Sequence, residues 1–460
     1  MPGLSKVFET ARRSLFAQRD AMDVTSHNIA NAGTTGYTRQ RAELTTTTPL
    51  PDRVGLLGTG VEMSSVSRLR EKFIDTQYRN TNQSLSNASM QSRIFSQIEA
   101  IINEPSSNGL QSMMQGFSKA WQALAATPED MGARQSVLQS ASTLANGIQQ
   151  IYSGLNQLRS DMKDEISSDI DKINELAKGI ADFNEKIITA QNSGMTANDL
   201  MDSRDLKIDE LSKIANIRTS FDAKGAINVS VGGISIVNQT DTVALRVRET
   251  GTKLSVTTTD FSSTATLTAG ELGGLMTQYN TTIPGYLSSI DEFGQSIMDS
   301  VNQAHASGYG LKASSSDPSA PTGTLFFSSY GNGVLSVNSS LATNPRLIAA
   351  SSTGAAGDNI QANKIANIFD QPTMNGGTVS HNQFYTALVG KIGTDSSDAS
   401  REEASQNLIL SQIEAQRNSF SGVSLDEEMT NMIRYQRAYD ASAKLVKVVD
   451  EMMTTIIQTI

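Results

Sequence analysis

Residues 424–460 read SLDEEMTNMIRYQRAYDASAKLVKVVDEMMTTIIQTI, and this stretch decides the fold because it predicts one long amphipathic helix. Ser424 and Glu427 have the spacing of a capping box, in which each side chain bonds a free backbone N–H of the other residue. The acids at positions 426–428 lie in the first turn, where the helix dipole favours negative charge. No Gly or Pro follows, so the sequence predicts a helix of about 50 Å that continues to Ile460.

The predicted helix has two unequal faces. Its polar stripe, spaced by three or four residues, consists of Arg437, Asp440, Lys444, Lys447, Glu451, Thr454 and Gln458. Its apolar band consists of Leu445, Val446, Val448, Val449, Met452, Met453, Ile456, Ile457 and Ile460. Complete burial of this band could contribute roughly 13–27 kcal/mol gross, at about 1.5–3 kcal/mol for each side chain. An exposed band of this width would aggregate, so we expect it to pack on its own chain or on other chains.

A second helical stripe at the other end of the chain is a candidate partner. Its members, again spaced by three or four residues, are Leu4, Phe8, Ala11, Leu15, Gln18, Met22, Thr25 and Ile29. Residues 1–41 hold six Lys or Arg and three acids, a net charge of +3, whereas residues 401–460 hold six Lys or Arg and nine acids, a net charge of −3. Opposite charge and matching stripes predict that the two ends pair. Two core helices of an ordinary globule would show the same periodicity, and this alternative stays open.

The composition limits the possible classes of protein. The chain has 460 residues, a net charge of −10 and no cysteine. Its length predicts roughly three domains. The acidic balance argues against a nucleic-acid partner, and the lack of cysteine excludes disulfides and thiolate metal sites. We expect no membrane insertion, because no apolar run approaches the length of a bilayer span, and no cleaved secretory signal at the N-terminus.

Helical patterns dominate the middle of the chain. One extends from Arg68 to Asn103, and a shorter one carries Phe117 and Trp121. Thr127 and Pro128 have the pattern of an N-cap and first helical residue, and predict a long helix that runs to Gln191. A capping box from Thr196 to Asp199 predicts another helix. Further helices are predicted at 270–306 and at 357–370. Two more helical segments are predicted between Ser380 and Gly422, and Ser400 and Glu403 cap the second of them.

Residues 218–268 show a different period. Apolar residues alternate with polar ones at 227–231, 234–237 and 243–247, and glycines separate these runs, which predicts short strands. Extended chain with a hairpin is likewise predicted between the first helix and Ser67. The predicted fold class is therefore mainly α: a long antiparallel helical bundle or coiled coil, built from both termini and the middle, with a small inserted β subdomain.

Four segments carry a resemblance to a known family. Residues 26–40, SHNIANAGTTGYTRQ, closely resemble the N-terminal signature of the axial proteins of the bacterial flagellum, which include rod, hook and hook-associated proteins. The ending Gly36-Tyr37-Thr38-Arg39-Gln40 looks like that of the members that form the hook–filament junction. Residues 198–205, NDLMDSRD, are similar to a middle segment of junction proteins. Residues 421–428 and 435–439 resemble the C-terminal signature of the same family.

The resemblance implies a structural protein that self-assembles into a tubular layer between hook and filament. Its implied partners are further copies of itself, the hook protein, a second hook-associated junction protein and a flagellar export chaperone. It implies secretion through the flagellar type III apparatus without a cleaved signal peptide, and a final location in the extracellular flagellum. The predicted subunit interface consists of Leu4, Phe8, Leu15, Met22, Ile29, Tyr37, Tyr435, Tyr439, Leu445, Val446, Val449, Met452, Met453, Ile456, Ile457 and Ile460. We also expect these terminal helices to be disordered in a free subunit.

The same resemblance yields a division into domains. Residues 1–67 and 422–460 form an inner domain of terminal helices, and residues 68–217, 269–307 and 357–421 form a helical rod domain. Residues 218–268 form the small β subdomain. Family members often carry a larger outer domain, and residues 308–356 are short enough to predict a reduced outer loop region in its place.

The sequence offers little catalytic chemistry, and we predict no enzyme activity, no cofactor and no metal site. His27, His305 and His381 lie far apart and match no zinc pattern, and no phosphate-binding loop or nucleophile elbow is present. Asp199, Asp202 and Asp205 step by three along a predicted helix beside Arg204, which is typical of caps and ion pairs. Two alternatives remain open: another axial protein, such as hook protein or a flagellin-like chain, and a helical-stalk adhesin or enzyme.

Overall fold

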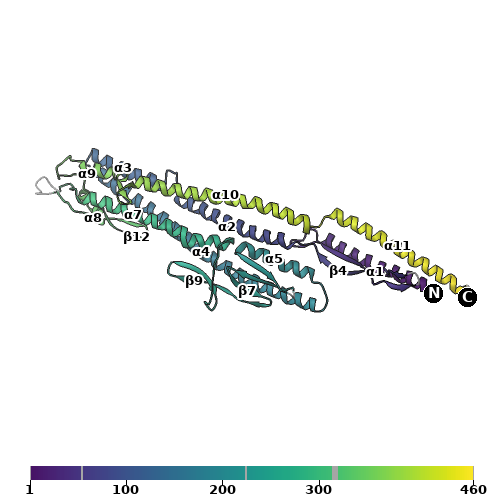
Figure 1. Cartoon of the computed structure of the whole chain (residues 1–460). Coiled ribbons are helices and arrows are strands. Elements are labelled where there is room, and N and C mark those ends of the chain that lie inside the picture. Colours follow the sequence, from purple (N-terminus) through teal and green to yellow (C-terminus); the bar gives the residue numbers. More distant parts are fainter. Residues whose placement is uncertain (1, 53–54, 223–224, 313–319, 459–460) are drawn as a thin grey trace.

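The computed structural model describes residues 2–52, 55–222, 225–312 and 320–458, and it shows an elongated molecule of long helices with small sheets on one side (Figure 1). This confirms the predicted fold class, mainly α with a small β insertion. The helices are α1 (Pro2–Ala30), α2 (Lys72–Ile102), α3 (Leu110–Ala126), α4 (Met131–Asn192), α5 (Asn198–Ile214), α6 (Gly270–Thr277), η1 (Gln278–Thr282), α7 (Ile283–Ala306), α8 (Ser339–Thr343), η2 (Pro345–Leu347), α9 (Ile360–Ala366), η3 (Ile368–Asp370), α10 (His381–Ser421) and α11 (Leu425–Gln458).

Antiparallel pairs form all of the described sheets. The strands are β1 (Gln40–Thr46), β2 (Leu50–Asp52), β3 (Gly55–Leu57), β4 (Val61–Arg68), β5 (Ile217–Phe221), β6 (Ile227–Val231), β7 (Ile234–Asn238), β8 (Asp241–Thr242), β9 (Leu245–Thr250), β10 (Lys253–Thr258), β11 (Thr264–Ala265), β12 (Phe327–Gly331), β13 (Val334–Val337), β14 (Pro372–Met374) and β15 (Val379–Ser380). The predicted β insertion is a four-stranded sheet, in the order β5-β6-β7-β8, and a three-stranded sheet, β11-β10-β9. The predicted hairpin before Ser67 is the long ribbon in which β1 pairs with β4.

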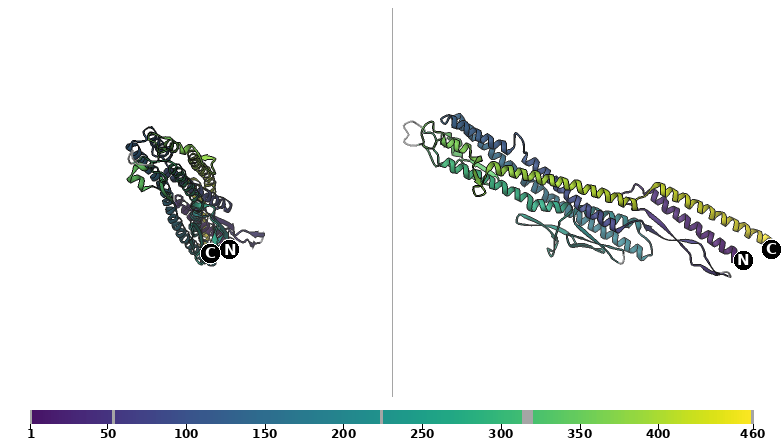
Figure 2. Two further views of the ribbon diagram at one scale, coloured as in Figure 1. Left: turned by 90° about the vertical axis from the view of Figure 1, so that its left-hand side faces the viewer. Right: turned by 45° about the horizontal axis from the view of Figure 1, so that its top comes forward.

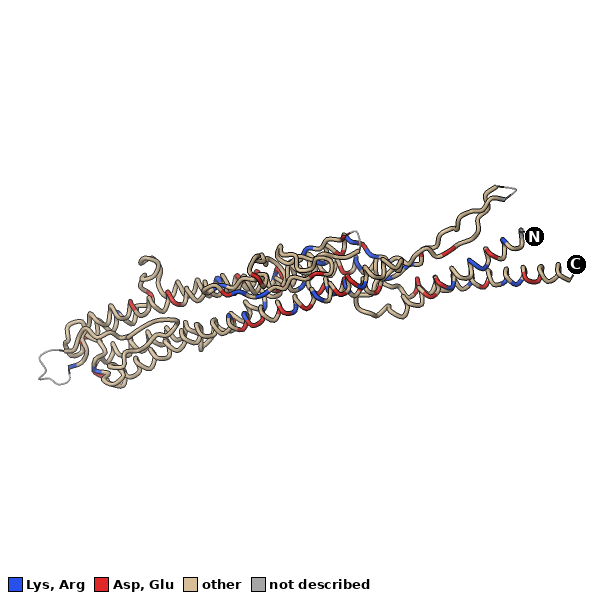
Figure 3. The backbone as a smooth tube through the Cα atoms, turned by 90° about the horizontal axis from the view of Figure 1, so that it is seen from below, with Lys and Arg blue, Asp and Glu red and all other residues tan. Residues whose placement is uncertain are grey.

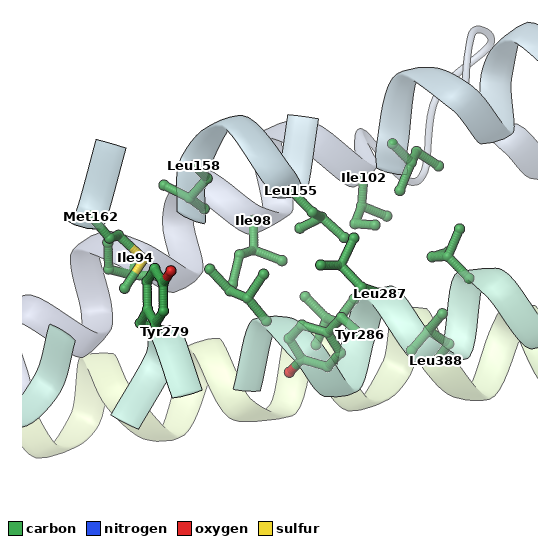
Figure 4. Packing of buried hydrophobic residues seen from close by; sticks show 14 of the residues in the cluster. Ile94, Ile98, Ile102, Leu155, Leu158, Met162, Tyr279, Tyr286, Leu287 and Leu388 are labelled. Carbon is green, nitrogen blue, oxygen red and sulfur yellow. The ribbon is translucent and has the colours of Figure 1, made fainter. Parts of the chain in front are cut away.

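The body of the molecule comprises α2 to α10 and is held together by one apolar core. Its longest helix, α4, has 62 residues and therefore extends about 90 Å. Apolar residues spaced by three or four along α4 are buried against α2 and α7, as Ile94, Ile98, Leu155, Leu158 and Leu287 illustrate (Figure 4). This spacing is the coiled-coil period, which keeps one stripe of a long helix facing its neighbours.

Both ends of the chain form an arm that projects from one end of the body. The arm consists of α1 and α11, which run side by side in opposite directions, so that the two termini lie at the same tip (Figures 1 and 2). The ribbon of β1 and β4 packs on α1 near the body. Its outer part, β2 and β3, extends towards the tip of the arm without joining it (Figure 3).

Several predicted helix starts are wrong. The N-cap of α4 is Asp130, whose carboxylate accepts bonds from the N–H groups of Gly132 and Ala133, because Thr127 already ends α3. The N-cap of α5 is Ala197, which forms no side-chain cap, so the predicted box from Thr196 to Asp199 is absent. Residues 381–421 form one helix instead of two, and its capping box is made by Ser380 and Gln383.

Two further segments differ from the prediction. The helix predicted at 270–306 is interrupted by η1, one turn of π-helix, which divides it into α6 and α7. The predicted loop region 308–356 contains β12, β13 and α8, because the adjacent Phe326 and Phe327 are completely buried and fix the chain to the body. The structure therefore adds order where a Ser- and Gly-rich composition predicted a loop.

An aromatic cluster closes the end of the body that lies far from the arm. The indole of Trp121 packs against Phe117, Phe326 and the imidazole of His305, with ring centroids 5.6–6.3 Å apart. His305 is buried and uses both ring nitrogens: Nδ1 donates to the Thr324 carbonyl at 2.7 Å, and Nε2 accepts from the Ala349 N–H at 2.9 Å. Only the neutral imidazole satisfies both bonds, and burial lowers the pKa of His305 to about 4.

The depressed pKa of His305 predicts a body that loses stability in acid. The unfolded chain takes up this proton near pH 6.5 and the folded chain near pH 4, so the contribution is complete above pH 6.5 and declines as the pH falls towards 4. We expect the free energy of unfolding to drop by about 2–3 kcal/mol more between pH 7 and pH 4.5 in the parent chain than in a His305→Gln variant. Urea titrations of both proteins, followed through Trp121 fluorescence, measure this difference. Equal pH dependence in the two proteins would contradict the assignment.

Candidate assembly interface and its joint to the body

The seam between α1 and α11 is lined with small side chains. Ala11, Ala17 and Ala21 are buried on α1, and Val449 is the buried apolar residue of α11. Ser14 and Ser442 meet between the helices, with 2.8 Å between their Oγ atoms. Small residues let two helices approach closely, and the pair forms within a single chain. In the structure both terminal segments are helical, and each helix covers the small face of the other.

The larger apolar side chains of the arm remain at its surface. Of the predicted interface residues, those classed as exposed are Phe8, Tyr439, Leu445, Met452, Met453 and Ile457. Those that are half-buried are Leu4, Leu15, Met22, Ile29, Tyr37, Tyr435, Val446 and Ile456, whereas Val449 lies in the seam and Ile460 lies outside the described residues. Val448, a member of the predicted apolar band, is also exposed, and so are Val7, Phe16, Met429 and Ile433, which the sequence analysis did not identify.

These exposed residues give the arm an apolar surface that a single chain leaves uncovered. Ile457 is 75% exposed and Met452 51% exposed, values typical of charged residues. Charged residues of both signs occur along the two arm helices between these apolar positions (Figure 3). The predicted apolar band of the last helix is therefore shared between a narrow seam with α1 and a wide outer face available to other molecules.

A joint at the base of the arm is built from the segment at positions 26–40. The side-chain amide of Asn28 bonds both backbone groups of Gln40, with its Nδ2 2.8 Å from the Gln40 carbonyl oxygen and its Oδ1 2.9 Å from the Gln40 N–H nitrogen. The Tyr37 hydroxyl donates to the same Oδ1 at 2.8 Å. Gly36 has a φ of +81°, a backbone conformation that favours glycine, and it lies against the side chain of Leu206. The chain can therefore turn sharply from α1 into the ribbon.

Arg39 and Glu428 connect the two arm helices at this joint. The Arg39 guanidinium donates to Glu428 Oε1 from Nε at 2.8 Å and to Glu427 Oε2 from Nη1 at 2.6 Å. The other Glu428 oxygen accepts from Asn28 Nδ2 at 2.9 Å, and this glutamate is only 2% exposed. Glu427 thus lies in the first turn of α11 and also contacts Arg39, the residue directly before β1. The acidic first turn of α11 fixes the arm to the chain that leaves α1.

One face of α5 carries a ladder of four acids that fixes the joint to the body. We call Asp199, Asp202, Asp205 and Asp209 the acid ladder. Asp199 accepts from Gln40 Nε2 at 2.7 Å, and Asp202 accepts from the Thr38 N–H at 2.9 Å. The ion pairs with arginines come from β4, from the link between β4 and α2, from α2 and from α10: Arg68 to Asp202 and Asp205, Arg70 to Asp205, Arg79 to Asp209, and Arg417 to Asp209.

Three members of the acid ladder, Asp202, Asp205 and Asp209, are buried, and their charges are compensated by arginine partners. Asp205 is 5% exposed, and the arginines Arg70, Arg68 and Arg79 overcome the cost of its burial and hold its pKa below the usual value. The prediction of ion pairs for Asp202 and Asp205 is correct, but Arg204 is not the main partner. Arg204 points away and bonds Asn184 Oδ1 at 3.0 Å and the Gly225 carbonyl at 2.8 Å.

The histidines considered in the sequence analysis contact other protein side chains. His27 is exposed, and its Nδ1 lies 3.1 Å from the Tyr37 hydroxyl. His381 is buried between Phe293 and Phe369 and contacts Ser296 and Thr373. Within the described ranges, no three His, Cys, Asp or Glu side chains are grouped so as to hold a metal ion. Across the same residues, none of the helices combines the length and apolar character needed to cross a bilayer.

Comparison with known families agrees with this geometry at both ends of the chain. Residues 8–38 match the family model described as flagella basal body rod protein, and residues 413–459 match the flagellar basal body rod FlgEFG protein C-terminal model. These segments are the arm and its joint. The paired terminal helices and the two matches define an axial protein of the bacterial flagellum.

The body specifies the family within this class. Residues 95–326 match the model described as the flagellar hook-associated protein FlgK helical domain. The chain is 31% identical to flagellar hook-associated protein 1 of Bacillus subtilis, over 98% of this chain and 97% of that protein. It is 24% identical to the protein of the same name from Escherichia coli, over 99% of this chain and 100% of the other. The chain belongs to the flagellar hook-associated protein 1 family.

A solved structure shows the same fold. The flagellar hook junction protein FlgK from Burkholderia pseudomallei superposes with a TM-score of 0.63 at 15% identity, over 75% of this chain and all of that one. The chain is thus a structural component of the bacterial flagellum, at the junction of hook and filament, as the sequence predicted. Membership in the axial family also indicates self-assembly and partners related to the hook.

Proposed function

We propose that the arm is the surface through which copies of this chain assemble into a tubular layer between hook and filament. The observation that carries this proposal is the outer face of the arm, where Phe8, Leu445, Met452 and Ile457 are exposed although the seam beneath them is already closed. Neighbouring arms packed side by side would bury these residues, which explains a band wider than one coiled-coil seam. The predicted interface set, from Leu4 to Ile460, keeps this role in the proposal.

The proposal also assigns the domains of the chain to inner and outer positions in the layer. Residues 1–67 and 422–460 form the inner domain, and residues 68–217, 269–307 and 357–421 form the helical rod domain around it. The β subdomain at 218–268 and the reduced outer region at 308–356 lie farther out. The acid ladder supports this division, because it fixes the direction of the arm relative to the body with buried ion pairs. A defined direction is required if identical subunits are to close a tube.

The proposal extends to partners and to export. One rim of the layer contacts the hook protein, and the other receives the second hook-associated junction protein. Export occurs through the flagellar apparatus without cleavage, and a cytoplasmic chaperone covers the exposed face of α11 beforehand. Twelve apolar residues of the arm in its described part combine exposure with large side chains, which is the kind of surface that needs such cover. The chain acts as a structural part without catalysis.

A deletion strain tests the proposed function. Cells of the source bacterium that lack this chain should retain intact hooks and release unattached filament protein into the medium, because the layer that joins the two is missing. Electron microscopy of the cells and an assay of the medium for filament protein measure this outcome, and the full chain supplied in trans should restore attached filaments. Loss of the hooks themselves would favour the alternative of a hook protein. Normal attached filaments would contradict the proposal.

A further inference from the structure

An acidic groove runs along the side of the body between α2, α7 and α10. Its volume is about 780 Å³, and its walls include Phe95, Tyr286 and Leu388. Its rim on α10 carries three carboxylates: Asp395, which pairs with Lys391 at 2.5 Å, Asp398, which pairs with Arg401, and Glu402. Gln278 also lines the groove, is 1% exposed, and leaves its Oε1 atom without a hydrogen-bond donor. We call these lining residues the acidic groove.

The π-helical turn η1 separates this groove from the β insertion. On one side of the turn, Gln278 and Thr281 line the groove. On the other side, the Asn280 side chain bonds both backbone groups of Leu254 in β10, with distances of 2.8 and 2.9 Å. The groove and the β9–β10 hairpin therefore lie at the same level along the body, on opposite sides of one turn. Figures 1 and 2 show the same arrangement, with α10 and the β9 strand on opposite sides of the body. π-helical turns occur often at functional positions.

A basic knob projects from the β9 side. Arg246 and Arg248 occupy alternate positions of β9, so their side chains share one face of the strand. Both guanidinium groups lie over the ring of Phe261, at 4.3 and 5.2 Å from its centroid, and this ring is itself 45% exposed. Neither arginine has an ion-pair partner among the described residues. We call Arg246, Arg248 and Phe261 the basic knob.

We propose that the basic knob of one copy of this chain inserts into the acidic groove of the next copy. Arginines recognise carboxylates through paired N–H donors, and the aromatic walls of the groove match the flat Phe261 ring. A contact between two different patches on opposite sides of one molecule passes from copy to copy, and a small rotation at each step closes a ring. This inference rests on the proposed assembly into a tube, and adds a contact between bodies to the contact between arms.

Engineered cysteines test the contact directly, because the natural chain contains none. A full-length Arg248→Cys chain is mixed with a full-length Glu402→Cys chain at concentrations where sedimentation shows oligomers, and both are then oxidised. We expect a disulfide-linked heterodimer on a non-reducing gel, and at least about a tenfold weaker band when Asp299→Cys replaces Glu402→Cys. Asp299 is an exposed acid of α7 outside the groove, which makes it a matched control.

Charge reversal supplies a second measurement. The Arg246→Glu/Arg248→Glu chain should need at least about a tenfold higher concentration to form oligomers, because like charges then meet across the contact. Adding Asp398→Lys/Glu402→Lys in the same chain should restore assembly, whereas Asp299→Lys should not. All of these positions are exposed in the single chain, so folding is retained.

The outcomes separate this inference from the proposed function. A Leu445→Cys chain, which carries its thiol on the outer face of the arm, serves as the reference. If this chain forms disulfide-linked dimers in the oligomers while the knob and groove cysteines do not cross-link, the contact between bodies is overturned and assembly through the arm stands. If neither the knob and groove cysteines nor the Leu445→Cys chain forms disulfide-linked dimers at any concentration, both proposals are overturned. Restoration of assembly by the double reversal supports the knob and groove contact specifically.

Discussion

A chain shortened to end at Lys444 should fold its body and fail to enter flagella. The described part of the removed segment, residues 445–458, contributes no buried side chain to the body, because within it only Val449 is buried, in the seam of the arm. They do supply Leu445, Val448, Met452, Met453 and Ile457 to the exposed face. At about 25 cal/mol for each Å² of apolar surface, burial of such side chains between copies would contribute several kcal/mol for each subunit, so we expect complete loss of incorporation.

Two measurements check this expectation. Immunoblots of purified flagella report incorporation, and thermal unfolding followed through Trp121 reports the body, whose midpoint should stay within about 2 °C of the parent value because no body contact is lost. Met452→Asp/Ile457→Asp in the full chain should reproduce the defect without truncation, since both residues are exposed in the single chain. Lys447→Gln/Glu451→Gln, which alters the polar stripe of the same helix, is the matched control and should incorporate normally. Attached filaments on cells that carry only the shortened chain would refute the role of the arm.

Replacement of Asp205 should destabilise the body more than any other single change in the acid ladder. The carboxylate lies 3.0 Å from Arg68, 3.1 Å from Arg70 and 3.8 Å from Arg79, and Asp205→Ala would leave these buried cations with too few partners. Loss of one member of a buried ion-pair network costs about 3–5 kcal/mol, and we expect the lower part of this range because Asp202, Asp75 and Asp209 still contact the same arginines.

Asp199→Ala provides the matched control for that substitution. Asp199 belongs to the same helix, but its side chain is 65% exposed, so its loss should cost less than about 1 kcal/mol. Urea unfolding of the parent and of both variants measures the free energies. The lowered pKa of Asp205 also fixes the sign of its pH dependence: its contribution is present above the pKa of an unfolded aspartate and is lost as the pH falls below it. Equal stability of the two variants would refute the buried network.

The long helices could be predicted because their signal is repeated many times. The apolar spacing of α4 extends over 62 residues, and no single substitution obscures a pattern of that length. The helix starts could not be predicted as well, since a capping pattern is a short local match. Thr127 and Thr196 both precede suitable residues, yet Asp130 and Ala197 occupy the caps because the previous helix or the joint determines where the backbone turns.

The candidate site was predictable in part for a similar reason. The terminal stripes were visible as periodic patterns, but the seam uses Ala17 and Ala21 instead of the larger neighbours Leu15 and Met22. Periodicity locates the buried face of a helix only to within about one position. The stripe with the smaller side chains lies in the seam because it lets the two helices approach closely. The acid ladder was visible as aspartates three residues apart. Its partners were not, since Arg68 is 134 residues away from Asp202 and the sequence carries no sign of that proximity.

The route of the chain has a consequence for how such a molecule can change over generations. The polypeptide leaves the arm at Arg39, completes the whole body, and re-enters the arm beside the same residue, where the Arg39 N–H bonds the Ser421 carbonyl at 2.9 Å. The body is in effect one very long insertion between the two helices of the arm. Insertions and deletions at the end of the body far from the arm can therefore lengthen or shorten the molecule while the paired helices α1 and α11 keep their geometry.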